Sequence, residues 1–238
     1  MGLTEYIKKK RFAPGPGVDE PPPDKGFKRF LFIFYHHFWR LITLNLLFLA
    51  FCLPVITIPA AICGANRVLI MLVREGNCSL WQDFFGEFKS SFFKSLPFGI
   101  PYIFLLLDSM YAFRISLVGD GVNVPAAALA FCLFGAATLF FGYAFVFIPA
   151  LPLKNRHIAK NAFIFMLTEW KTNIIMLAVT LAMTAVLALT AMGSIMIALA
   201  LLAFIYFSLS QLMICAAVAQ PMQKRIIEPY ELNHKKES

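Results

Sequence analysis

Long apolar stretches dominate this sequence and limit the folds open to it. Six mostly apolar runs cover residues 30–53, 54–73, 97–117, 124–151, 173–191 and 194–219. A bilayer core about 30 Å thick needs roughly 20 apolar residues in a helix. Because 60% of the 238 residues are hydrophobic and only 14% are charged, a water-soluble core has no room for these side chains. The sequence therefore predicts an all-α, polytopic transmembrane helical bundle.

The lysines and arginines indicate how the chain is oriented. Seven lie in residues 1–34, three in 74–96, four in 152–172 and four in 219–238, which together are 18 of the 21. Such residues collect on the cytoplasmic side of a membrane. Six spans place all four segments and both termini on the cytoplasmic side of a bacterial-type cell membrane. Five spans, with one helix running through 53–59, would put seven basic residues outside, so we favour six. The net charge of +8 thus indicates a membrane surface and not nucleic acid.

The chain divides into three parts. Residues 1–26 are rich in proline and glycine and predict a disordered cytoplasmic tail, 27–220 form the membrane domain, and 221–238 form a cytoplasmic C-terminal tail. Within the membrane domain, 79–94 and 155–171 carry aromatic residues at helical spacing. They predict two amphipathic helices lying in the cytoplasmic interface. Polar residues in these segments form a candidate partner-docking surface: Gln82, Glu87, Lys89, Lys160, Glu169 and Lys171.

A few polar residues interrupt the apolar runs and are candidate functional residues. Asp108 lies about midway along the third run, and Arg67 in the second is its nearest plausible partner by depth. Such a pair is either a substrate or coupling-ion site or a structural ion pair that sets helix packing, and both alternatives stay open. Asn45 and Asn66 lie in the first two runs. Amides there usually form hydrogen bonds between helices, although a binding role also stays open.

Catalytic signatures are missing from the sequence. It contains no Walker loop, dinucleotide glycine motif, nucleophile elbow or zinc-binding His-Glu-x-x-His motif. The five cysteines are widely spaced and form no Cys-x-x-Cys pair. His36 and His37 are adjacent, so on a helix their side chains diverge and cannot easily chelate one metal ion. We therefore expect no catalytic residue, no metal site, no cofactor and no enzymatic activity.

Two motifs carry a resemblance to a known family. They are Leu44-Asn45-Leu46-Leu47 with Leu53-Pro54-Val55-Ile56-Thr57-Ile58, and Phe84-Phe85-x-x-Phe88-Lys89. On these residues the chain resembles the YesL family, small bacterial membrane proteins with a domain of unknown function. The resemblance is strongest over residues 27–95 and extends to about residue 220. Members tend to be encoded beside carbohydrate-uptake systems, so the resemblance implies an accessory role in sugar uptake and no catalytic residue.

Three functions are open on these grounds. The first is a non-enzymatic membrane accessory or scaffold protein that works with the permease subunits of a carbohydrate ABC transporter, in the lipid bilayer and with homo-oligomers allowed. The second is a small stand-alone transporter or channel with Asp108 and Arg67 at the midplane. The third is an enzyme of membrane lipids or glycans. The sequence offers few polar groups that could converge at the midplane, so we favour the first.

Overall fold

The computed structural model describes residues 27–117, 123–227 and 229. This part of the chain is helical and contains no strand. Its elements are α2 (Phe27–His36), α3 (Phe38–Cys52), the 3-10 helix η1 (Val55–Thr57), α4 (Ile58–Glu75), α5 (Leu80–Leu117), α6 (Val124–Ala150), α7 (Asn155–Thr168), α8 (Trp170–Gly193), α9 (Ile195–Leu201), the π-helix η2 (Leu202–Tyr206), α10 (Phe207–Met222) and the π-helix η3 (Gln223–Ile227).

The number of membrane-length helices agrees with the sequence prediction. Five segments are long and apolar enough to cross a bilayer: Val55–Glu75, Leu80–Ala112, Val124–Ala150, Trp170–Gly193 and Ile195–Ile227. A sixth span results if α2 and α3, which are bent by 84° relative to each other, are counted together. The predicted all-α architecture of five or six spans is thus confirmed.

The connection between α3 and α4 interrupts the helix. The helix α3 ends at Cys52, the short η1 follows, and α4 begins at Ile58. The hydroxyl of Thr57 donates to the carbonyl of Phe51, and its distance to the carbonyl oxygen of Pro54 is 2.6 Å. The alternative of one helix running through 53–59 is therefore wrong. With 15 residues, α3 is about 22 Å long, so it needs α2 to reach across a bilayer.

The most buried helix is α4, which packs against α5, α6 and α10. Two glycines bring α4 and α5 together. A Cβ atom on Gly64 of α4 would lie 3.0 Å from the carbonyl oxygen of Phe84 in α5. A Cβ atom on Gly99 of α5 would lie 1.9 Å from Cγ of Pro59 in α4. Small residues of this kind let helices approach closely, and here they set the contact at the centre of the bundle.

The segment 79–94 was expected to be a separate interfacial helix, and this expectation is wrong. It is the first part of α5, which continues to Leu117 through Pro97 and Pro101. Part of its aromatic face packs on protein, because Phe84 is fully buried and its ring lies 5.8 Å from the ring of Phe51 in α3, whereas Trp81 stays exposed. Helical spacing of aromatic residues suits a protein contact as well as a lipid contact, so the pattern alone did not separate the two.

Most of the second expected segment, 155–171, forms a helix of its own, but α7 ends at Thr168, and Trp170 and Lys171 already belong to α8. Along α7 the buried residues are Ile158, Ala162 and Phe165. The ring of Phe165 lies 5.0 Å from that of Phe147 in α6, so α7 packs across the end of α6. The side chain of Asn155 also ties α7 to α5, since its Nδ2 donates to the carbonyl of Lys94 at 3.1 Å.

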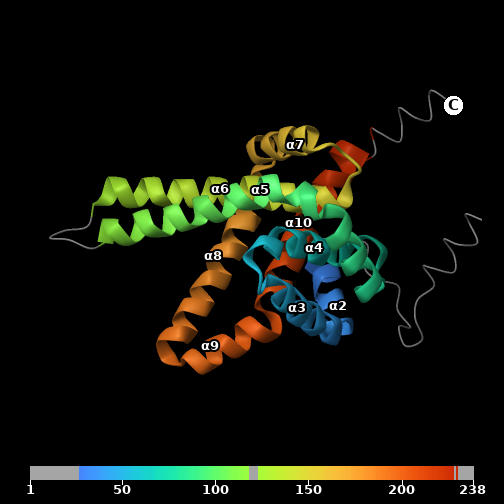
Figure 1. Cartoon of the computed structure of the whole chain (residues 1–238), viewed down its shortest axis with the longest axis horizontal. Helices are drawn as coiled ribbons and strands as arrows, with labels where there is room; N and C mark the ends of the chain where they lie inside the picture. The colour runs from blue at the N-terminus through green and yellow to red at the C-terminus, as the bar shows by residue number, and fades with distance from the viewer. Residues whose placement is uncertain (1–26, 118–122, 228, 230–238) are drawn as a thin grey trace, which may run out of the picture.

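Two helical hairpins extend from the central bundle. Figure 1 shows α5 and α6 running side by side toward the left, and α8 and α9 forming a second, bent arm below them. Both arms expose large apolar side chains, including Phe104 and Leu107 on α5 and Met192 and Met196 on α8 and α9. Extended apolar surface of this kind suits a lipid surround.

Helical structure continues past residue 220, where the membrane domain was expected to end. The helix α10 continues to Met222 and η3 to Ile227, so the first residues of the expected tail belong to the last helical segment. The N-terminal tail, residues 1–26, lies outside the described residues, as do 228 and 230–238 of the C-terminal tail.

Candidate functional site

Asn45 binds the π-helical turn η2 in the span that runs from Ile195 to Ile227. It is fully buried on α3, and its Nδ2 donates to the carbonyls of Leu202 and Ala203 at 2.8 and 2.7 Å. Its Oδ1 accepts from the backbone N–H groups of Phe207 and Ser208, both at 3.0 Å. An amide side chain has two N–H donors and two acceptor positions, so all of them are used. Asn45 therefore completes the backbone of the π-helical turn η2.

Asn66 and Arg67 serve the C-terminal end of α6. Proline has no N–H, so Pro149 leaves the carbonyl of Phe145, four residues earlier, without its helical donor. Nδ2 of Asn66 donates to that carbonyl at 3.1 Å, and Oδ1 of Asn66 lies 3.7 Å from Sγ of Cys215. Nη1 of Arg67 donates to the carbonyl of Pro149 at 3.0 Å. Both side chains thus supply donors that the end of α6 lacks.

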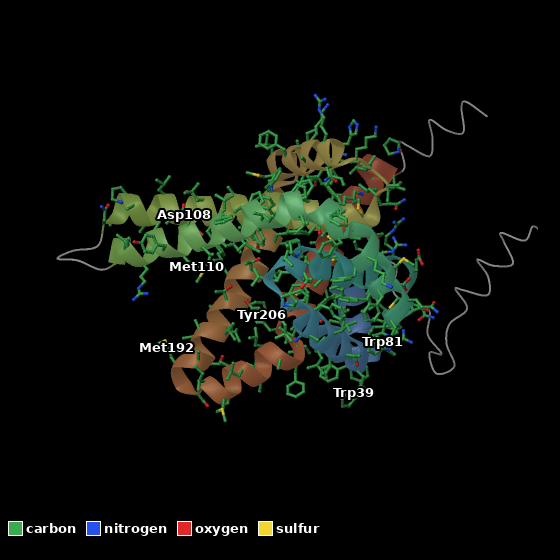
Figure 2. The ribbon with its side chains drawn as sticks, in the orientation of Figure 1. Trp39, Trp81, Asp108, Met110, Met192 and Tyr206 are labelled. Carbon is green, nitrogen blue, oxygen red and sulfur yellow. The ribbon has the colours of Figure 1, made fainter. Side chains whose placement is uncertain are left out.

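The expected pairing of Asp108 with Arg67 is wrong. Asp108 is exposed on α5, and within the described ranges it forms no hydrogen bond or ion pair. Figure 2 shows it on the arm formed by α5 and α6, away from the central bundle. The positions of the two residues within their apolar runs suggested similar depths in the membrane, and therefore a possible contact. Arg67 instead points to α6, and Asp108 lies on a face of α5 that the other helices leave open.

The six candidate docking residues lie in three places, on α5, on α7 and at the start of α8. Gln82 and Lys89 are exposed on α5, and Lys160 is exposed on α7. Glu87 is half-buried and accepts a hydrogen bond from the hydroxyl of Ser91 one turn later. The other two residues, Glu169 and Lys171, line a cleft between α8 and α10.

This α8–α10 cleft was not foreseen from the sequence. It is open to the surface and has a volume of about 770 Å³. Its walls are the start of α8 with the residue before it, the end of α10 with η3, and Phe30 of α2. The residues missed by sequence reasoning are Gln220, Lys224 and Arg225. The sequence did hold an indication of this neighbourhood, because segments 152–172 and 219–238 were both predicted to lie on the cytoplasmic side.

An ion pair crosses one end of the cleft. Nε of Arg225 lies 2.5 Å from Oε1 of Glu169, and its Nη1 donates to the hydroxyl of Thr168 at 3.1 Å. The ammonium group of Lys171 lies 5.5 Å from the ring centre of Trp170, which is within range of a cation–π contact. The two contacts of Arg225 join η3 to the connection between α7 and α8.

In the described ranges, no three His, Cys, Asp or Glu residues are grouped so that they could hold a metal ion. Cys63 and Cys215 are buried within the bundle. Cys78 lies in the connection between α4 and α5, and burial raises the pKa of its thiol to about 11. A thiol of that pKa is almost entirely protonated near neutral pH and is a poor nucleophile.

Together these features define an all-helical protein with five or six membrane-length helices, in which Asn45, Asn66 and Arg67 bind backbone carbonyls of other helices. Residues 41–109 match the model of a family described as a protein of unknown function, DUF624. The matched stretch covers most of α3, all of α4 and most of α5, and supports the domain-of-unknown-function family to which the sequence motifs pointed. No curated protein and no solved structure matches the chain.

Proposed function

We propose that this chain is a non-enzymatic accessory or scaffold protein of the YesL type, embedded in the cell membrane with both termini in the cytoplasm. We further propose that it associates with the permease subunits of a carbohydrate ABC transporter. The sugar-uptake part rests on the sequence resemblance, and the orientation rests on the distribution of lysine and arginine.

The observation that carries the scaffold role is the use made of the polar residues between the helices. Asn45, Asn66 and Arg67 all bind backbone groups of neighbouring helices. A transporter or channel needs polar groups that face a pathway and remain available to its cargo. Here these groups hold helices together, which favours a structural role in an assembly.

The surface offered to a partner lies on α5 and α7. Gln82, Lys89 and Lys160 are exposed, and the aromatic side chains of Trp81 and Phe163 beside them are also more than half exposed. Mixed polar and aromatic surface is typical of protein interfaces. If the orientation is as proposed, this surface faces the cytoplasm near the membrane.

Site-specific photocrosslinking tests the proposal. A photoreactive residue at Gln82 or Lys160 should capture a permease subunit in cells that express a neighbouring sugar-uptake system. The same photoreactive residue at Met192, exposed in the last turn of α8, serves as the control and should capture no permease. Absence of a permease from the Gln82 and Lys160 products, with the uptake system expressed, would refute the association.

The alternative of a stand-alone transporter or channel has one feature in its favour, the exposed carboxylate of Asp108. An exposed ionisable group on a membrane-length helix is costly unless it faces water or a partner. Proteoliposomes that contain only the purified chain separate the two functions. Sugar or ion flux that Asp108→Asn abolishes would overturn the scaffold proposal, whereas the scaffold proposal expects no flux.

A further inference from the structure

We propose that the α8–α10 cleft binds an anionic phospholipid from the surrounding bilayer, with the headgroup at Lys171 and Lys224 and an acyl chain along the apolar wall. This proposal is independent of the association with a transporter. It rests on the shape of the cleft, the order of residues along its two walls and its charge.

The two walls change from apolar to basic in the same direction. On α8, Lys171 lies one helical turn before Ile175, so the basic residue is nearer the start of the helix. On the opposite wall Met213 and Ala217 precede Lys224, which follows the end of α10. Lys224 lies 11 positions after Met213 along the helix, a rise of about 16 Å. A basic end joined to an apolar groove of this length matches a phospholipid headgroup followed by the upper part of an acyl chain.

The charge at the basic end favours an anion. Among the described residues that line the cleft, Glu169 is the one carboxylate, and its Oε1 lies 2.5 Å from Nε of Arg225. Lys171 and Lys224 therefore remain as two positive charges without a neutralising carboxylate in the described part of the cleft. Both residues are exposed. Basic pockets between helix ends on the cytoplasmic side are a known form of site for anionic headgroups.

The apolar wall selects a lipid over a soluble anion. Ile175, Met213, Ala216 and Ala217 line the cleft beyond its basic end. The alanines leave room that a larger side chain would fill, and hydrocarbon gains about 25 cal/mol for each Å² of apolar surface removed from water. Inorganic phosphate would use the two lysines but gain nothing from this wall. A lipid uses both parts of the cleft.

The test measures lipid retained by the purified full chain in mild detergent, by native mass spectrometry, after incubation with equal amounts of phosphatidylglycerol and phosphatidylcholine. We expect preferential retention of phosphatidylglycerol. The double variant Lys171→Gln, Lys224→Gln should lower that preference by about 30-fold, from about 1 kcal/mol for each lysine at about 1.4 kcal/mol per tenfold. The control double variant Lys154→Gln, Arg156→Gln removes the same charge from exposed positions outside the cleft and should keep the preference.

A third variant separates a lipid from a soluble anion. Ala217→Phe fills the apolar wall and leaves both lysines in place, so it should release the lipid while the chain stays folded by size exclusion and circular dichroism. Equal retention of the two lipids by the unaltered chain would overturn the proposal, as would an equal loss in the control double variant. Two results together would indicate a phosphate site instead. They are full competition by about 10 mM inorganic phosphate, a concentration chosen to fill even a weak anion site, and undiminished lipid retention in Ala217→Phe.

Discussion

Replacement of Asn45 by leucine should destabilise the bundle, because the side chain completes the backbone of the last span. The amide makes two hydrogen bonds to carbonyls and accepts two from N–H groups around η2. Leucine is similar in size but offers neither donors nor acceptors. Asn45→Leu therefore removes four hydrogen bonds at a position where the side chain is fully buried.

The size of the effect follows from the number of bonds. Hydrogen bonds between membrane helices average about 0.6 kcal/mol each, so four of them correspond to about 2.4 kcal/mol. Buried groups left unsatisfied can cost more, about 1–3 kcal/mol each, but the turn at η2 can recover part of this by rearranging toward a regular α-helix. We expect Asn45→Leu to lower the free energy of unfolding by about 2–4 kcal/mol.

Reversible unfolding in mixed micelles of mild detergent and sodium dodecyl sulfate, followed by far-ultraviolet circular dichroism, measures this change. Ser208→Ala is the matched control, because the buried hydroxyl of Ser208 lies beside the same network and has no hydrogen-bond partner in the described part of the chain. It should shift the unfolding free energy by less than about 0.5 kcal/mol. If Asn45→Leu is as stable as Ser208→Ala, the amide does not support the π-helical turn as argued.

Two further predictions concern the packing of α5 and its exposed carboxylate. Gly99→Ala should lower the folded yield and the thermal stability, because its Cβ would lie 1.9 Å from Cγ of Pro59, whereas Gly86→Ala on the same helix meets no atom within 4 Å and should be neutral or stabilising by up to about 1 kcal/mol. Asp108→Leu should leave the folded yield unchanged or raised in fluorescence-detected size exclusion, since Asp108 has no described partner to lose. A large loss of folded Asp108→Leu, or a normal yield of Gly99→Ala, would contradict the packing described here.

Much of the fold can be predicted from the sequence, because the length of the apolar runs and the positions of the basic residues can be read directly from it. The length and spacing of the apolar runs predict membrane-length helices, and the distribution of basic residues favours a break after the first of them. The clustering of basic residues predicted that segments 152–172 and 219–238 lie on one side. The ion pair between Glu169 and Arg225 agrees with that neighbourhood.

The structure alone shows which polar groups meet. Asn45 binds backbone groups about 160 residues away, and Arg67 binds Pro149 and not Asp108. Such partners depend on the rotation and depth of each helix against its neighbours, and apolar periodicity leaves both open because lipid and protein accept the same side chains. Here the close contacts at Gly64 and Gly99 set the rotation and depth of α4 against α5, and these contacts exist only in the packed structure. For this protein the sequence determined that the chain forms membrane-length helices, and the tertiary packing decided that its buried amides hold the bundle together and that a basic cleft opens between α8 and α10.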